Sequence, residues 1–268
     1  MRRAQAAGAE GETAEVQLLS PQSELAFVSG WYELASASHF WMVGRLAAVL
    51  RQCRAHGIPL AAPLRLLEIG CGEGVLRAQL EGHSAWTIDG CDLDLASLRH
   101  NPRGRGEVFL YDIFQRLPAL EARYDGLLLF DVIEHIADVP AFLEAALFHL
   151  KPGGWVFLNV PALQSLYSRY DEVVGHQRRY DKRLMTDELQ RAGLTVVALT
   201  YWGLSFLPLL LLRQQLLKGA ATEQVVAQGF RPPSALANAL LTWLIRAEVA
   251  LLGHPVRGTS LLAIGRKA

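Results

Sequence analysis

Cysteine and net charge are both scarce in this chain of 268 residues. The three cysteines, Cys53, Cys71 and Cys91, are widely spaced and form no CxxC pair, which argues against a disulfide framework. We therefore expect reduced thiols in a cytoplasmic protein. Because 26 basic residues balance 26 acidic ones, the chain lacks an overall electrostatic footprint for DNA or RNA, and we expect no nucleic-acid partner.

Long uncharged apolar runs are also lacking. Leu204–Leu212 is almost wholly apolar but is followed by Arg213, and Leu236–Leu252 carries two charged residues. Neither reaches the roughly 18 uncharged residues that a membrane-spanning helix needs. We expect buried helices that cap a substrate pocket, and the alternative is that residues 204–252 contact a membrane surface. The protein would then be cytoplasmic or associated with a membrane.

The N-terminal segment has no visible secretory signal. Residues 1–17 are rich in Ala, Gly and Glu and lack an apolar stretch. We expect residues 1–20 to form a disordered tail. Residues 21–60 are predicted to be a helical segment rich in aromatic side chains, including Trp41. It either packs on the sheet or closes as a lid over the segment that follows.

What the chain does contain is a regular alternation of strand-like and helix-like segments, which predicts parallel βαβ units. The predicted helices are Glu24–Leu50, Val75–Leu80, Pro140–Leu150 and Met185–Ala192. The predicted strands are Leu64–Ile69, Trp86–Cys91, Glu107–Tyr111, Tyr124–Phe130, Trp155–Val160, Leu194–Thr200 and Ser260–Ile264. The last two strands are separated by an insertion of about sixty residues that does not follow this alternation.

The first predicted strand ends in a loop with glycine at alternate positions, Gly70, Gly72 and Gly74. Glycine tolerates positive φ and has no Cβ, so this loop can turn tightly and let a ligand approach the backbone. A strand, a glycine loop and a helix in this order are typical of the nucleotide-binding edge of a doubly wound α/β sheet.

Acidic residues gather at the same edge. Glu68 precedes the first glycine, and the next two strands end in Asp92 and Asp112. These charges would repel the pyrophosphate of a dinucleotide, whereas they suit S-adenosylmethionine, which carries a sulfonium, an ammonium and a ribose diol. Asp92 lies 20 residues after Gly72, the usual distance for an acid that binds ribose hydroxyls. Asp112 is placed to accept a hydrogen bond from the adenine amino group.

Taken in order, five segments resemble the class I S-adenosylmethionine-dependent methyltransferases. They are LLEIGCGEG (66–74), GCDLD (90–94), YDIF (111–114), YDGLLLFDVIEHI (124–136) and LKPGGWVFLNVP (150–161). The resemblance implies a three-layer αβα fold around a seven-stranded sheet of order 3-2-1-4-5-7-6, with strand seven antiparallel. The methyltransferase domain would cover residues 61–268, including an apolar helical insertion at 202–258.

The resemblance also implies a set of cofactor-binding residues. Phe130 and Asp131 would face the methyl donor and the acceptor. Asp92 and Leu93 would bind the ribose, and Asp112 and Ile113 the adenine. The methionine end would be bound by residues of the glycine loop and the strand before it: Glu68, Gly70, Cys71, Gly72 and Gly74.

Candidate catalytic residues follow the fourth strand. Asp131, Glu134 and His135 stand at i, i+3 and i+4, so on a helical turn all three would point the same way. With His176 they are similar to the divalent-metal site of ubiquinone-biosynthesis and small-RNA O-methyltransferases, in which the ion binds and acidifies a hydroxyl. Asp131 is one methylene shorter than the first ligand of those enzymes. The metal-free alternative makes His135 or His176 a general base.

The loop around His176 also carries candidate substrate-binding residues, Arg178, Arg179 and Tyr180, where the arginines could clamp a phosphate or carboxylate. Trp41 is a further substrate-binding candidate. The apolar insertion points to O-methylation of a small hydrophobic or lipid-linked acceptor. The alternatives are C- or N-methyl transfer, or a scaffold protein that keeps the fold without turnover.

Overall fold

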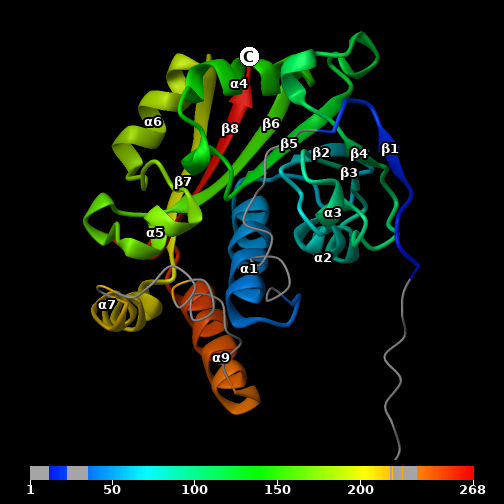
Figure 1. The fold of residues 1–268 in the computed structure, drawn as a ribbon. Helices are drawn as coiled ribbons and strands as arrows, with labels where there is room; N and C mark the ends of the chain where they lie inside the picture. The colour runs from blue at the N-terminus through cyan, green and yellow to red at the C-terminus, as the bar shows by residue number, and fades with distance from the viewer. Residues whose placement is uncertain (1–11, 23–35, 218, 220–224, 226–233) are drawn as a thin grey trace, which may run out of the picture.

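The computed structural model describes residues 12–22, 36–217, 219, 225 and 234–268 of this chain. An eight-stranded sheet runs through its centre in the order β1-β4-β3-β2-β5-β6-β8-β7 (Figure 1). The strands are β1 Val16–Leu18, β2 Arg65–Ile69, β3 Thr87–Asp92, β4 Val108–Leu110, β5 Tyr124–Phe130, β6 Leu150–Pro161, β7 Leu194–Trp202 and β8 Ser260–Lys267.

The seven predicted strands and their order are confirmed. Neighbouring strands from β4 to β6 pair in parallel, while β8 runs antiparallel to both β6 and β7. The largest error in a predicted strand boundary is in β6, which begins at Leu150 rather than Trp155. Residues 151–154 form an irregularity within this strand, where the pairing with β5 shifts register.

An eighth strand was not predicted. Val16, Gln17 and Leu18 pair in parallel with β4, so the expected disordered tail is wrong for this part of residues 1–20. The reason is that β4 offers an open sheet edge, a tertiary feature that local composition does not reveal. Residues 1–11 of the predicted tail lie outside the described residues.

Alternate residues of each central strand enter two different cores, which explains the three layers. Leu66, Leu128 and Phe157 face one side, where they meet side chains of α1, α2 and α9. Leu67 and Leu127 face the other side, against α4 and α6. The α-helices described are α1 Phe40–Ala55, α2 Val75–His83, α3 Leu95–Leu98, α4 Val139–Phe148, α5 Arg169–Val174, α6 Lys182–Arg191, α7 Leu207–Leu216 and α9 Ala235–Leu251.

The N-terminal helix differs from its prediction. Helix α1 begins at Phe40, capped by the His39 side chain, and extends to Ala55 rather than ending at Leu50. The first half of the predicted helix, residues 23–35, lies outside the described residues. Helix α1 packs against α9, and a Cβ at Gly44 would meet the Ile245 side chain at 2.6 Å, so the helices approach closely there.

The apolar insertion lies between β7 and β8, at the carboxyl edge of the parallel strands (Figure 1). It contains α7 and α9. None of the helices in the described part of the chain has the length and apolar character that crossing a bilayer requires.

Candidate active site

The glycine loop between β2 and α2 adopts a backbone conformation that favours glycine at all three alternate positions. Gly70, Gly72 and Gly74 have φ of 76°, 51° and 73°. A Cβ at Gly70 would also meet the Val132 side chain at 2.6 Å. A side chain at any of these positions would strain the loop or fill it. Because glycine has none, the backbone of the loop stays open to a ligand. Asn101 supports the loop because its amide donates to the Gly72 carbonyl at 2.6 Å.

Glu68, at the end of β2, is a buried carboxylate beside this loop, with 4% of its surface exposed. Its Oε2 has no hydrogen-bond partner among the residues that the structure describes. Burial raises the pKa of Glu68 to about 7, although Arg45 and Arg77 oppose this shift. Leaving a buried acceptor without a hydrogen bond costs free energy. Glu68 is therefore suited to a donor or cation brought by a ligand.

Asp92 is brought to the glycine loop, as predicted from the sequence. One carboxylate oxygen accepts from the Gly72 N–H at 2.9 Å, and the other accepts from Leu93 N–H at 2.7 Å and from Asp94 N–H at 3.0 Å. Burial raises the pKa of Asp92, and these three backbone donors oppose the shift. The carboxylate thus joins the end of β3 to the loop.

Asp112 follows β4, where its carboxylate accepts from the Phe114 N–H at 3.0 Å. Its own N–H donates to the hydroxyl of Ser20, just beyond β1, at 2.8 Å. The neighbouring Ile113 is buried in the core, with 4% of its surface exposed. The unpredicted strand β1 therefore brings the Ser20 hydroxyl next to Asp112, the residue predicted to bind the adenine.

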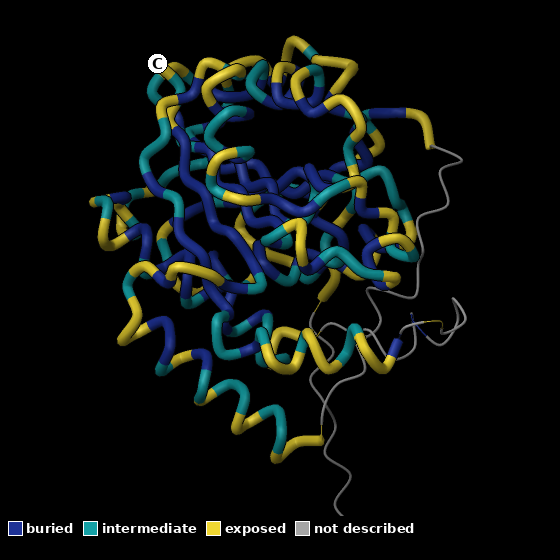
Figure 2. Tube along the Cα trace, turned by 90° about the vertical axis from the view of Figure 1, so that its left-hand side faces the viewer, coloured by how far each residue is buried: buried dark blue, intermediate teal, exposed yellow. Residues whose placement is uncertain are grey.

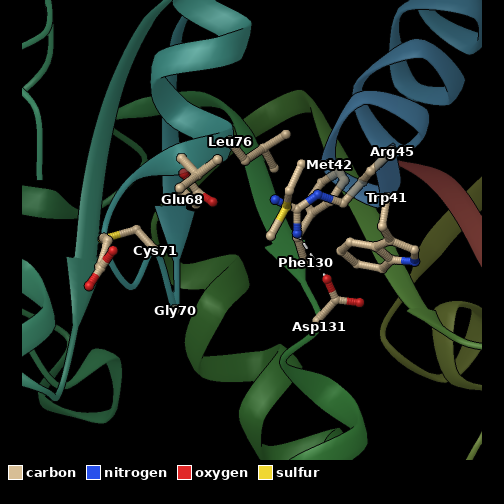
Figure 3. Close-up of a pocket in the computed structure, with 11 residues that line it drawn as sticks. Trp41, Met42, Arg45, Glu68, Gly70, Cys71, Leu76, Phe130 and Asp131 are labelled. Atoms are coloured by element: carbon tan, nitrogen blue, oxygen red, sulfur yellow. Dashed lines mark hydrogen bonds and ion pairs between the residues drawn. The ribbon is translucent and has the colours of Figure 1, made fainter. Parts of the chain in front are cut away.

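A cavity of about 80 Å³ opens between the glycine loop, the end of β5 and helix α1. Figure 3 shows Trp41, Met42 and Arg45 entering it from α1, while Glu68 and Cys71 lie across from them. The predicted residues on its walls are Trp41, Glu68, Gly70, Cys71, Phe130 and Asp131. Glu73, Val75 and Leu76 also line it, and the sequence analysis did not assign these or Met42 and Arg45. The sequence did contain a signal for Arg45, because it is the sole charged residue in the apolar segment between Phe40 and Leu50.

Arg45 forms an ion pair with Asp131 across this cavity. Its guanidinium donates to Asp131 Oδ2 at 3.0 Å and lies 5.1 Å from the centre of the Trp41 ring (Figure 3). The other Asp131 oxygen accepts from the Asn159 amide at 2.9 Å, and Asn159 accepts from the Trp202 indole. This hydrogen-bonded chain links α1 to the ends of β5, β6 and β7.

The expectation that Asp131 points the same way as Glu134 and His135 on one helical turn is wrong. Asp131 has a φ of 59°, and only Ile133–His135 form a short 3-10 helix. The positive φ turns the Asp131 carboxylate towards Arg45 instead. Burial raises the pKa of Asp131, with Arg45 and Asn159 opposing that shift.

Glu134, His135 and His176 do come together. Each offers a ligand atom, and these atoms lie within 4.8 Å of one another. Glu134 is fully buried, and neither of its carboxylate oxygens has a hydrogen-bond partner among the described residues. Burial, reinforced by the negative charge of Asp131, raises the pKa of Glu134 well above its usual range. Three of the four predicted metal ligands therefore form a group, and Asp131 lies outside it.

The two histidines of this group differ in their surroundings. His135 has an exposed edge, but neighbouring groups desolvate its imidazole and His176 adds repulsion, which together lower its pKa to about 4. The rings meet edge to face with centroids 4.8 Å apart. His176 is buried, and its Nδ1 lies 2.8 Å from an oxygen of Asp171.

The predicted substrate clamp at Arg179 and Tyr180 is not supported. Arg179 is 4% exposed and donates to both oxygens of Asp171, at 2.8 and 3.1 Å. Tyr180 is fully buried in the core, where its hydroxyl donates to the Ile133 carbonyl at 3.4 Å. Both side chains are occupied within the fold, so they support the loop. Arg178 is partly exposed and donates to the Ala137 carbonyl at 3.2 Å.

Comparison with known families identifies this arrangement. The profile described as "Methyltransferase domain" matches residues 41–199, which is more than half of the chain. The chain belongs to this family. It is an S-adenosylmethionine-dependent methyltransferase domain, and S-adenosylmethionine is the cofactor that this family indicates.

The relatives of this methyltransferase domain share only part of its length. The ubiquinone biosynthesis O-methyltransferase of Leptothrix cholodnii is 33% identical over 36% of the chain and 43% of that protein. The enzyme of the same name from Parvibaculum lavamentivorans is 30% identical over 50% of the chain and 58% of that protein. The chain thus spans about half the length of these curated relatives.

The fold is shared more widely than the sequence. The phosphoethanolamine N-methyltransferase 2 of Haemonchus contortus, solved with S-adenosylmethionine, superposes with a TM-score of 0.53 at 18% identity. The superposition covers 82% of this chain and 52% of that one. At this identity the likeness speaks for the fold alone.

Proposed function

We propose that this domain transfers a methyl group from S-adenosylmethionine to a hydroxyl of a small hydrophobic or lipid-linked acceptor. The observation that carries the proposal is the group of Glu134, His135 and His176, on the loops next to Phe130 and Asp131 of the cavity. Methyl transfer to a hydroxyl requires a proton to be removed, and this group supplies acid–base or metal-binding side chains for that step. A scaffold role would leave the group without this use.

The residues around the cavity fit the cofactor. The glycine loop leaves its backbone free for close approach, and Glu68 offers a buried oxygen without a donor. The amino-acid end of S-adenosylmethionine is a zwitterion, and Glu68 and Arg45 line the same cavity with opposite charges. Asp92 for the ribose, and Asp112 with Ile113 for the adenine, remain predictions from the sequence, which their positions at the end of β3 and after β4 support.

The same loops could hold a divalent metal ion. Glu134, His135 and His176 are the residues that would ligate it, and a bound ion would lower the pKa of an acceptor hydroxyl. An orphaned buried carboxylate beside two imidazoles is a donor set that suits such an ion. In the metal-free form of the proposal, a neutral histidine accepts the proton.

Transfer to a hydroxyl can be tested directly. Purified protein is incubated with methyl-labelled S-adenosylmethionine and catechols that carry prenyl chains of increasing length, with prenyl amines of matched length as the comparison. We expect label in the catechols, rising with chain length and falling after dialysis against EDTA if the metal is required. Transfer to the amines alone, or to neither series, would contradict the proposal.

The acceptor is proposed to be apolar because of helices α7 and α9. All ten residues of α7 are described and none is buried, as Figure 2 shows for this end of the molecule. Exposed leucines at 209, 212 and 216 follow one face of α7, and Leu236, Leu240 and Trp243 follow one face of α9. Apolar area of this extent is typical of a surface that meets a lipid or a ligand.

Contact between these helices and a membrane surface is therefore part of the proposal. Residues 202–258 contain five Lys or Arg and two Asp or Glu, although the whole chain is neutral. Exposed apolar faces with a local excess of positive charge suit an anionic lipid surface. A contact between Trp41 and the acceptor also remains a proposal. So does the role of residues 21–60 as a lid, of which residues 23–35 lie outside the described part of the chain.

Flotation with phosphatidylcholine vesicles, with and without phosphatidylglycerol, tests the membrane contact. We expect binding that increases with phosphatidylglycerol and is lost in the Leu212→Glu, Trp243→Glu double variant. Leu18→Glu is the matched control, because Leu18 is equally exposed but lies on β1 at the far edge of the sheet. Equal behaviour of the two variants would argue against this surface.

A further inference from the structure

Asp171 is a buried carboxylate that the proposed reaction does not yet use. It lies on α5, is fully buried, and receives hydrogen bonds on both oxygens. Oδ1 lies 2.8 Å from His176 Nδ1 and accepts from Arg179 Nε at 2.8 Å. Oδ2 accepts from Arg179 at 3.1 Å and from the Ser168 backbone and hydroxyl at 2.8 and 3.0 Å.

These contacts determine which nitrogen of His176 carries the proton. A carboxylate surrounded by donors and paired with a guanidinium is ionised, and an ionised carboxylate can only accept hydrogen bonds. His176 must therefore donate from Nδ1, which leaves the lone pair on Nε2. The backbone N–H of His176 also donates to the Asp171 carbonyl at 2.8 Å, so the same residue holds both the main chain and the ring.

A ligand nitrogen of His176 lies within 4.8 Å of the ligand atoms of Glu134 and His135. With Nδ1 occupied by Asp171, Nε2 is the atom of His176 available to a cation or a proton beside those two residues. A hydrogen bond from the distal nitrogen to a carboxylate orients a histidine and increases the basicity of its other nitrogen.

We propose that Asp171 is a positioning residue that fixes His176 in the Nδ1–H tautomer and aims Nε2 at Glu134 and His135. The functional consequence rests on the proposed role of His176 as ligand or base. The tautomer itself follows from the contacts of Asp171 and can be tested separately.

A purely structural role for Asp171 is the competing explanation. Asp171 closes a capping box with Ser168 at the start of α5, and it pairs with Arg179. Ser168→Ala removes a donor to Oδ2 but leaves the bond between Oδ1 and His176 intact. It is therefore the matched control, because it weakens the cap without touching the tautomer.

Nitrogen-15 NMR of protein labelled at its eight histidines provides the test, with His176 assigned through His176→Gln. We expect His176 to carry its proton on Nδ1 in the wild type and in Ser168→Ala, and to show a mixture of tautomers in Asp171→Asn. A wild-type spectrum with the proton on Nε2 would overturn the proposal, and so would an unchanged spectrum in folded Asp171→Asn. If Asp171→Asn does not fold, the wild-type and Asp171→Glu spectra decide.

Binding of Co²⁺, followed by its visible absorption, provides the second readout. We expect Asp171→Asn to bind Co²⁺ roughly 10- to 100-fold more weakly than the wild type, as for other partners of metal-bound histidines, and Ser168→Ala to match the wild type. A wild type that binds no Co²⁺ would count against the proposed metal and leave the tautomer to be judged by NMR. Equal weakening in both variants would make Asp171 structural.

Discussion

The glycine loop between β2 and α2 keeps its shape through backbone conformation, whereas the group of Glu134, His135 and His176 depends on side chains from two separate loops. The loop has positive φ at each of its three glycines. The second group needs the 3-10 turn after β5 and the loop after α5 to meet, and it includes a buried carboxylate that has no hydrogen-bond partner in the described part of the chain. The proposed cofactor side is thus formed locally, and the proposed acceptor side is assembled by the fold.

This difference predicts how the two sides respond to substitution. Changes at the glycine loop should reduce cofactor binding, because they alter the surface that the cofactor approaches. Changes at the second group should reduce turnover and leave cofactor binding intact, because we propose that these side chains act on the acceptor. Four substitutions test this difference, in order of decreasing effect.

The largest effect is expected for Glu134→Gln, which keeps the shape of the side chain and removes the carboxyl group that can exchange a proton or bind a cation. We expect turnover to fall roughly 10²- to 10⁴-fold, the contribution of a positioned acid–base group, while calorimetry shows unchanged affinity for S-adenosylmethionine. Glu144→Gln, an exposed position on α4, serves as the control. A loss of cofactor affinity in Glu134→Gln would remove the distinction between the two sides.

Glu68→Gln should change the pH dependence of stability. The pKa of Glu68 is raised from 4.5 to about 7, so the folded protein binds more protons than the unfolded chain between these values. The free energy of unfolding of the wild type should then fall relative to the variant as pH rises from 4.5 to 7, by about 3 kcal/mol in total. Urea unfolding at a series of pH values measures this, with the exposed Glu121→Gln as control.

Gly70→Ala should weaken cofactor binding. Its φ of 76° and the close approach of Val132 make a Cβ unfavourable there, and strain of 1–3 kcal/mol corresponds to roughly a 10- to 100-fold loss in affinity. Gly82→Ala is the control, because a Cβ at Gly82, on α2, has open space around it. Equal affinities by calorimetry in the two variants would mean that the loop backbone does not form the cofactor surface.

Arg45→Met should have the smallest effect and tests where the cofactor's carboxylate lies. Losing a charged hydrogen bond of ~1.5 kcal/mol would weaken the binding of S-adenosylhomocysteine about tenfold. S-adenosylmethionine should lose less, because the unpaired Asp131 then attracts its sulfonium. Arg51→Met is the control, since Arg51 lies on the same helix but donates to the Val249 carbonyl away from the cavity. Equal losses for both ligands would place Arg45 away from the sulfonium.

Local patterns were sufficient for most of the sheet and for the cofactor side. Apolar segments predicted all seven strands, because a strand's burial is recorded in its own sequence, and the order of the strands came from the resemblance to class I methyltransferases. The glycine loop and Asp92 were predicted for the same reason. Positive φ is indicated by glycine, and the end of a strand by the residues next to it in the sequence.

The tertiary structure decided the remainder, where residues distant in sequence compete for the same partner. Asp131 was grouped with Glu134 and His135 by spacing, yet Arg45, 86 residues earlier, takes its carboxylate. Arg179 was predicted to bind substrate, yet Asp171 binds it in the interior. Strand β1 formed because β4 left an edge open. By itself the sequence determined the fold and the cofactor edge, which follow from local periodicity and backbone conformation. Only the packed structure decided which charged side chains face the site, because each ion pair depends on what the fold places beside it.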